Sequence, residues 1–235
     1  MVKKHIVSIS APKSWPIKRK AEMFLLRPNP GRDMDTSMPI GIIMKDLLHL
    51  TSTTKETKKV LKDGKVLVNK KKIGEVKYPV GLMHVLEVPE LSSYYRLILS
   101  TKGKIRMQGI DEKESSVKPC KIINKRSLSG GKMQINFDDG TNLLSDKKDY
   151  KVGDTLVLEL PALKPKEHLK MEKGALVYVT AGTKVGVLGT FEGIKSFKGG
   201  QPDNVLIKTK DGTIETRKEY ALVVGHNGKS AISLE

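Results

Sequence analysis

The first clear pattern of hydrophobic positions has the period of an α-helix. Between residues 39 and 50, apolar side chains recur three or four positions apart, at Ile40, Ile43, Leu47 and Leu50. Pro39 suits the first helical turn, because an amide at that position needs no helical partner. The spacing therefore predicts a helix over residues 39–50. We expect His49, which lies on this helix, to belong to the core or its edge and not to be a metal ligand.

A second helix is predicted over residues 54–62, where basic positions dominate. Thr53, or its neighbour Ser52, can cap the first turn, and Glu56 follows Thr53 at capping-box spacing. Gly64 can end the helix in a left-handed conformation. The basic residues are spaced by three, four and seven, so they line one side of the helix: Lys55, Lys58, Lys59 and Lys62. A short strand, a basic turn and the start of another strand follow over residues 65–73.

Residues 91–165 show short strand-like stretches separated by turn signals. Strands are predicted over residues 94–100, 104–108, 118–126, 132–137 and 155–160, with Gly- and Asp-containing turns between them. Strands this short, with turns this frequent, indicate a small antiparallel sheet or barrel. Residues 161–173 contain two prolines and are predicted to be a linker. The acidic pairs Asp111-Glu112 and Asp138-Asp139 fall in predicted turns, where acidic residues serve the backbone.

The last part of the chain alternates again and predicts a small five-stranded barrel. Strands are expected over residues 176–180, 185–194, 204–209 and 213–216, with an Asp211-Gly212 turn in the last hairpin. Three glycines interrupt the second of these strands, at Gly186, Gly189 and Gly193. Glycine weakens a strand, so we expect it where a barrel bends or another backbone comes close.

Residues 1–38 are predicted to form an extended arm that folds on a partner. Prolines break up regular structure there, and basic residues surround Trp15, the single tryptophan. Two roles are open for Trp15: stacking with bases, or anchoring the arm to the protein's own core. The roles can coexist.

Composition narrows the class of partner. The net charge is +17, from 43 Lys and Arg against 26 Asp and Glu, and every quarter of the chain is basic. A chain that lies along a polyanion has this even excess, and nucleic acid is the first candidate. The sequence shows neither a membrane-spanning run nor a signal-peptide pattern, so we expect a cytoplasmic protein. The single Cys120 excludes an internal disulfide, and the scattered histidines lack metal-ligand spacing.

Two segments resemble known RNA-binding modules. The first resembles the two-helix module named after bacterial small-subunit ribosomal protein four. It consists of residues 55–72 and the helix predicted before them, and it includes Asp63-Gly64-Lys65-Val66-Leu67-Val68-Asn69. Residues 174–194, with Gly182, Gly186 and Gly189, resemble the KOW motif. Both segments are preceded by three short motifs: Lys3-Lys4-His5, Ala11-Pro12-Lys13 with Trp15, and Arg27-Pro28. In this order, the segments resemble the archaeal and eukaryotic type of small-subunit ribosomal protein four, and the archaeal type is closer.

The resemblance implies a structural constituent of the small ribosomal subunit, not an enzyme. The expected fold is α+β and multidomain: an extended N-terminal arm (1–38), a small α/β RNA-binding module (39–90), a central, mostly antiparallel β domain (91–170) and a C-terminal SH3-like KOW β-barrel (171–235). The expected partners are small-subunit ribosomal RNA and neighbouring ribosomal proteins, with neither a membrane nor a small-molecule substrate. No cofactor is expected, and structural Mg²⁺ would be held mainly by RNA.

The residues expected to bind RNA are basic residues of the arm, the module and the barrel, with a few polar neighbours. They are Lys3, Lys4, His5, Lys13, Trp15, Lys18, Arg19, Lys20, Arg27, Arg32, Lys55, Lys58, Lys59, Lys62, Lys65, Asn69, Lys70, Lys71, Lys72, Lys195, Lys198 and Gly199. The alternative for the helix lysines is a solvated face without a partner.

Two other classes of protein share parts of this pattern. Pseudouridine synthases carry the same two-helix module, but they need a catalytic Asp in a Gly-Arg-x-Asp setting after it. Here the nearest string, Gly31-Arg32-Asp33, lacks the intervening residue and lies before the module. Transcription elongation factors carry KOW motifs, but neither the arm nor the two-helix module is expected in them.

Overall fold

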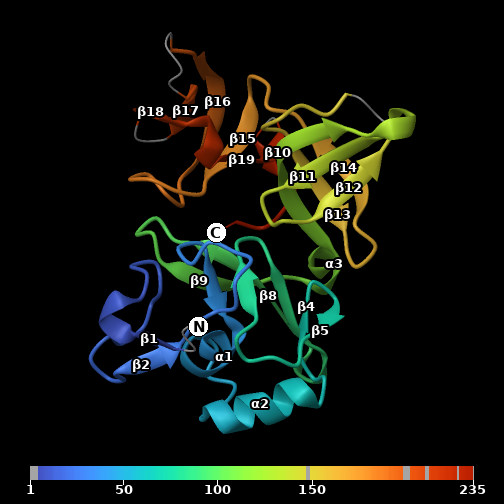
Figure 1. Ribbon diagram of the computed structural model, residues 1–235. Coiled ribbons are helices and arrows are strands. Elements are labelled where there is room, and N and C mark those ends of the chain that lie inside the picture. Colours follow the sequence, from blue (N-terminus) through green and yellow to red (C-terminus); the bar gives the residue numbers. More distant parts are fainter. Residues whose placement is uncertain (1–4, 147–148, 198–201, 210–211, 227, 235) are drawn as a thin grey trace. The chain divides into compact units, whose positions relative to one another are not determined.

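The computed structural model describes residues 5–146, 149–197, 202–209, 212–226 and 228–234 (Figure 1). The chain forms two compact units, residues 1–116 and residues 117–235. Both consist mainly of antiparallel strands, with few helices. This confirms the coarse prediction of a multidomain fold built mostly of antiparallel sheets. The finer division into four segments stays a prediction.

The first unit contains a five-stranded sheet in the order β5-β4-β7-β8-β9. In that order, its strands are Lys71–Lys72, Leu67–Val68, Val85–Val88, Ser93–Leu99 and Ile105–Gly109. The last two match the strands predicted over residues 94–100 and 104–108. Because β7 pairs with the first half of β8 along its whole length, the sheet of the first unit continues through these strands. The short helix α3 (Glu112–Ser115) follows β9.

The first predicted helix is present but shorter than its pattern suggested. α1 (Ile40–Ile42) continues as a wider turn through Leu47, in which the Leu48 amide donates to the Ile43 carbonyl at 3.0 Å. Of its predicted apolar face, Ile40 and Ile43 are fully buried, whereas Leu47 and Leu50 are half-buried. His49 lies beyond the helix with a φ of 51°, and its side chain is exposed. A left-handed residue cannot continue a helix, so the predicted extension to residue 50 is wrong.

The second helix, α2 (Thr54–Lys62), has the predicted bounds. The Thr53 hydroxyl oxygen accepts from the Glu56 amide at 3.2 Å, and the Glu56 carboxylate accepts from the Ser52 amide at 2.8 Å. The cap is therefore confirmed, with the carboxylate reaching one residue further back than in the usual capping box. Gly64 follows the helix with a φ of 71°, the left-handed conformation that the sequence predicts.

The described part of residues 1–38 is folded and belongs to the first unit. β1 (His5–Val7) pairs with β2 (Phe24–Leu26), and β3 (Ser37–Pro39) pairs with β6 (Pro79–Gly81). Between these strands, Trp15 is completely buried, and its indole nitrogen donates to the Ser37 carbonyl at 2.9 Å. Burial of a large aromatic ring with a satisfied N–H is a strong anchor. The predicted extended arm is thus wrong for residues 5–38, as is base stacking on Trp15, whereas its anchoring role is confirmed.

The first sheet of the second unit has the order β12-β11-β10-β13-β14. Its strands in sequence order, β10 to β14, are Val117–Ser127, Met133–Phe137, Asn142–Ser145, Thr155–Glu159 and Lys164–Leu169. β14 occupies the segment predicted to be a linker, which corrects that prediction. Pro165 fits there because β14 lies at the sheet edge and pairs with β13 across an irregular register, so the missing amide costs little.

The second sheet of this unit has six strands in the order β18-β17-β16-β15-β19-β20, of which Figure 1 labels the first five. In sequence order, β15 to β20 are Ala175–Val179, Leu188–Lys195, Asn204–Thr209, Gly212–Arg217, Ala221–His226 and Lys229–Ser230. The predicted last hairpin is confirmed by the pairing of β17 with β18, although Asp211 lies outside the described residues. A Cβ at Gly189 would lie 2.6 Å from the carbonyl oxygen of Lys208, so the predicted close approach of another backbone at this glycine is confirmed.

Candidate nucleic-acid interface

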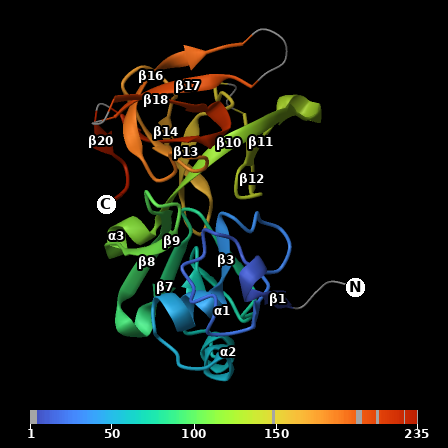
Figure 2. The same cartoon turned by 90° about the vertical axis from the view of Figure 1, so that its left-hand side faces the viewer.

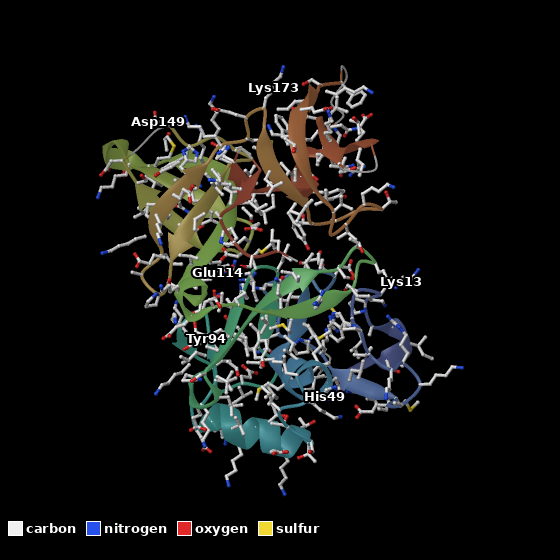
Figure 3. All side chains as sticks on the ribbon, turned by 180° about the vertical axis from the view of Figure 1, so that it is seen from behind. Lys13, His49, Tyr94, Glu114, Asp149 and Lys173 are labelled. Carbon is white, nitrogen blue, oxygen red and sulfur yellow. The ribbon has the colours of Figure 1, made fainter. Side chains whose placement is uncertain are left out.

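The basic residues of α2 form one exposed face, as the sequence predicts. Thr57 and Leu61 are buried on the opposite side of the helix. All four lysines on the other side are exposed: Lys55, Lys58, Lys59 and Lys62. Long side chains that end in nitrogen project from α2 in Figure 3. The amphipathic pattern therefore fixes both the packing of this helix and the direction of its charges.

The hairpin after α2 adds two more lysines at the end of the helix. Lys71 and Lys72 form β5, which lies at the edge of the sheet, and both are exposed. A Cβ at Gly64 would lie 3.3 Å from Lys72 Cδ and 3.8 Å from its Nζ, so the Lys72 side chain lies over the C-terminal end of α2. A cation is favoured there by the helix dipole. We call the six residues the lysine surface: Lys55, Lys58, Lys59, Lys62, Lys71 and Lys72.

The lysine surface has a net charge that its surroundings do not cancel. Within the described residues, no carboxylate oxygen lies within 4.0 Å of any of its six ammonium groups. Six like charges on one small area repel one another, and this repulsion is relieved when a polyanion binds. The arrangement thus suits a phosphate backbone.

Two predicted RNA-binding residues in the same hairpin have internal partners instead. Asn69 and Lys70 have φ values of 51° and 64° and form the two-residue turn between β4 and β5. The Asn69 side-chain oxygen accepts from the Val85 amide at 3.0 Å. Lys70 Nζ lies 3.0 Å from the buried Glu87 carboxylate and 2.9 Å from the Ser115 hydroxyl. The structure thus gives both residues a role in the fold, and the RNA contacts predicted for them stay predictions of lesser weight.

Lys65, the remaining basic residue of this hairpin, is exposed but paired. Its ammonium lies 3.1 Å from the Glu90 carboxylate, and both side chains face solvent. An exposed pair of this kind contributes little to stability, so it can exchange Glu90 for phosphate at low cost. Lys65 therefore stays a predicted contact of lesser weight than the lysine surface.

Arg19 organises the N-terminal segment from inside. Its guanidinium donates to four backbone carbonyls, those of Ser8, Ile9, Ala11 and Pro12, at 2.7–3.2 Å. Such a fork uses most of its donors, so Arg19 serves the fold, and the phosphate contact predicted for it stays a prediction of lesser weight. The segment also contacts β9, since the Ile105 amide donates to the Ser14 carbonyl at 2.8 Å and Lys104 donates to the carbonyl of Lys13, which Figure 3 labels.

The other predicted contacts of this segment differ in accessibility. His5, Lys13, Lys18 and Lys20 are exposed, whereas Arg27 and Arg32 are half-buried. The Arg32 side chain lies against Gly81, where a Cβ would come within 2.7 Å of its Nη1. Lys3 and Lys4 lie outside the described residues. For the exposed residues the RNA contact stays a prediction.

The predicted site near the end of β16 is described only in part. Lys195 is exposed, but its ammonium lies 3.3 Å from Glu215 and 5.4 Å from the centre of the Phe197 ring. Lys198, Gly199 and Gly200 lie outside the described residues. The structure therefore reduces the weight of Lys195 as a phosphate ligand and leaves the loop after it as a prediction.

Buried charges of the second unit serve the fold. Burial lowers the pKa of Lys121 to about 8, although nearby acidic groups favour its charged form. Its ammonium donates to the carbonyls of Lys218 and Glu219 at 2.8 and 2.7 Å. A lysine with a lowered pKa is a candidate for catalysis only where a substrate can reach it. Here two carbonyls cover the buried ammonium, so its role is structural.

The described residues contain no group of three or more His, Cys, Asp or Glu side chains that could hold a metal ion. Asp139 of the acidic pair 138–139 is buried and forms an ion pair with Lys118, which removes it from contact with solvent cations.

None of the helices in the described part of the chain combines the length and apolar character that crossing a bilayer requires.

Together, the fold and the lysine surface define a β-rich, multidomain protein suited to binding a polyanion. Residues 91–164 match the model of the ribosomal family S4e, and residues 2–31 match the RS4NT domain. The small ribosomal subunit protein eS4 of Methanocella arvoryzae is 36% identical over 222 residues, which are 94% of each chain. The eS4 of Methanocaldococcus jannaschii is 37% identical, over 95% of this chain and 94% of the relative.

A solved structure agrees with these matches. The crystal structure of the 30S ribosomal protein S4e from Thermoplasma acidophilum covers 83% of this chain and 98% of its own, with a TM-score of 0.71 and 29% identity. The chain belongs to the ribosomal S4e family. This membership confirms the resemblance found in the sequence, and with it the prediction of a ribosomal protein in place of a pseudouridine synthase or an elongation factor.

Proposed function

We propose that this protein is a structural constituent of the small ribosomal subunit and binds ribosomal RNA without catalysis. The observation that carries the proposal is the lysine surface, six exposed ammonium groups with no carboxylate partner among the described residues. The relatives named small ribosomal subunit protein eS4 supply the partner class. Neighbouring subunit proteins are further partners, and a ribosomal location implies the cytoplasm.

The finer assignment of the domains is part of the same proposal. The segment from α1 to β5 has two helical stretches, a glycine after the second, and a basic hairpin with a two-residue turn. These features support the assignment of a two-helix RNA-binding module. The sheet β15–β20 has a glycine against its neighbouring strand at Gly189 and left-handed glycines at Gly182 and Gly186, which supports a KOW-type SH3-like barrel. We expect no cofactor of the protein's own, and any Mg²⁺ at the interface to be held mainly by RNA.

Phosphate contacts would supply most of the affinity. Each lysine that meets a phosphate releases condensed counterions, so affinity falls steeply as salt rises. The RNA helices of a ribosome are A-form, and their narrow major groove excludes side chains. The lysine surface would therefore track the backbone of such a helix, and its specificity would come from shape.

Two measurements test the proposal. The affinity of the full chain for transcribed small-subunit ribosomal RNA should fall linearly on a double-logarithmic plot against salt, with a slope of about −0.9 for each phosphate neutralised. The endogenous protein should sediment with small subunits. A flat salt response, or sedimentation apart from the subunits, would overturn the proposal.

A further inference from the structure

The two halves of the long strand β10 pair with different neighbours in its sheet. Val117–Lys121 pair with β13, whereas the second half pairs with β11 as far as Ser127. β11 in turn pairs with β12. The outer part is thus a three-stranded extension, and Figure 2 shows β10 leading into a long hairpin. The sequence predicted β10, β11 and β13 but not β12, and it assigned no binding chemistry to any of these strands.

The register places polar side chains together on one face of this extension. Asn124 is the cross-strand partner of Asn136, Arg126 of Gln134, and Asn136 of Asn142. Cross-strand partners project from the same side of a sheet. On the opposite side, Ile135 and Phe137 are buried in the core. We call the five residues on the open side the amide face: Asn124, Arg126, Gln134, Asn136 and Asn142.

The amide face is accessible and carries only positive charge. Asn124, Arg126 and Asn142 are exposed, and Gln134 donates to the half-buried Asn136 side chain at 3.0 Å. Between Ile122 and Phe137 the sequence contains Lys125, Arg126 and Lys132 and no acidic residue. Among the described residues, no carboxylate oxygen lies within 4.0 Å of the Arg126 guanidinium. Leu144 lies at the margin of the face, as the partner of Gln134.

The tip of the hairpin leaves space for a backbone to approach. Gly130 and Gly131 have φ values of 81° and 75°, and a Cβ at either position would meet nothing within 4 Å. Lys132 and Ser129 flank these glycines, and both are exposed. A basic side chain next to open glycines is a setting in which phosphate can come close to the main chain.

We propose that the amide face binds the shallow minor groove of an A-form RNA helix, an inference that rests on the proposed function. Arg126 and Lys132 meet phosphates, and the amides of Asn124, Asn136 and Asn142 exchange hydrogen bonds with 2′-hydroxyl groups. Side-chain amides both donate and accept, as the 2′-hydroxyl does, and this groove displays those hydroxyls. The face has no aromatic side chain on which unpaired bases could stack, which favours a helix over a single strand.

The binding test uses the full chain and three probes: a 20-base-pair RNA duplex, a DNA duplex of the same sequence and a single-stranded oligouridine. The variant Arg126→Ala/Lys132→Ala should bind the RNA duplex about tenfold more weakly, because two phosphate contacts are lost. The matched control, Lys164→Ala/Lys166→Ala, removes the same charge from exposed positions of β14 and should change affinity less than about twofold. Equal losses in the two variants would overturn the proposal.

The amides are tested at constant charge. Asn124→Ala/Asn142→Ala should reduce the preference for the RNA duplex over the DNA duplex about fivefold or more, since only RNA offers 2′-hydroxyls. An unchanged preference, or stronger binding to oligouridine than to the duplex, would contradict the minor-groove assignment.

A cleavage experiment locates the contact in ribosomal RNA. Cys120 is the only cysteine, and it is buried, so a Ser129→Cys variant can carry an iron chelate at the hairpin tip alone. In assembled small subunits, cuts should appear on both strands of one RNA helix. Cuts confined to a single-stranded region, or protein crosslinks without RNA cuts, would overturn the inference. If the wild-type chain assembles and the tip yields no cuts, only this inference fails, whereas failure of the wild type to bind RNA removes the proposed function itself.

Discussion

Lys118 and Asp139 form an ion pair inside the second unit, with only 2% and 3% of their side chains exposed. The pair joins β10 to the turn before β12, and the Thr141 amide and hydroxyl donate to the other carboxylate oxygen of Asp139. Two buried charges require each other, because either one alone would be left without compensation in a medium of low polarity. The pair thus holds the base of the hairpin that carries the amide face.

Removing one member of this pair should destabilise the second unit strongly. We expect Lys118→Ala to lower the free energy of unfolding by about 3–5 kcal/mol, since it leaves the Asp139 carboxylate buried and unpaired. The double variant Lys118→Met/Asp139→Leu should recover most of that loss. Urea unfolding followed by circular dichroism measures both. A single variant as stable as the wild type would show that the pair is dispensable.

The same pair predicts a loss of stability in acid. Burial by itself raises the pKa of Asp139, but the Lys118 ammonium and the hydrogen bonds from Thr141 outweigh it and lower the pKa from 3.8 to about 2. A lowered pKa stabilises the folded state above about pH 4, and this contribution, about 2 kcal/mol, is lost as the pH falls toward 2. Urea midpoints between pH 5 and pH 2 should fall further for the wild type than for Lys118→Met/Asp139→Leu. Parallel curves would contradict the assignment.

Trp15 should report a folded N-terminal segment before any RNA is added. It is the only tryptophan, so its fluorescence should be blue-shifted and shielded from acrylamide in the free protein. Trp15→Ala should cost about 3–5 kcal/mol of stability, as for other large-to-small core substitutions. Trp15→Phe should cost less, since it keeps most of the apolar area and loses only the hydrogen bonds to Met34 and Ser37. A red-shifted, readily quenched spectrum would indicate an unfolded segment.

The sequence predicted correctly those features that are set by residues close to one another along the chain. The bounds of α2 follow from Thr53, Glu56 and Gly64, which lie within one or two turns of the helix, and the exposure of its lysines follows from the helical period. The partners of Trp15 lie about twenty residues further on, so the pattern around it could not distinguish an anchor from a stacking ring. The ion pair of Lys70 with Glu87 is hidden from the sequence for the same reason.

The sequence did not reveal features that depend on the position of a strand in its sheet or on the register between strands. Pro161 and Pro165 suggested a linker, but an edge strand tolerates a missing amide, so β14 forms. The amide face escaped notice because Asn124, Arg126, Gln134 and Asn136 come together only through the register of two strands. One signal was available, namely the absence of any acidic residue from Ile122 to Phe137 in a chain that is 29% charged.

Gly64 should be hard to replace, although it lies at the surface of α2's C-terminal end. Its φ of 71° is left-handed, and an added methyl group would press against the Lys72 side chain at 3.3 Å. Gly64→Ala should therefore cost about 1 kcal/mol or more of stability. It should also weaken RNA binding slightly, by displacing Lys72. Thermal unfolding and the RNA titration would measure the two effects, and an unchanged melting temperature would show that the strain is absent.

The lysine surface should account for a defined part of the salt dependence of RNA binding. Lys58→Ala/Lys62→Ala removes two unpaired ammonium groups from α2, so the slope of log affinity against log salt should become shallower by roughly two units. Lys65→Ala/Lys195→Ala removes the same charge from two exposed lysines that already lie beside Glu90 and Glu215, and should change the slope by less. Both pairs of substitutions leave buried contacts intact, so unfolding midpoints should stay near the wild-type value. If the two variants lose the same slope, the net charge of the chain, and not the position of the lysines on α2, governs binding.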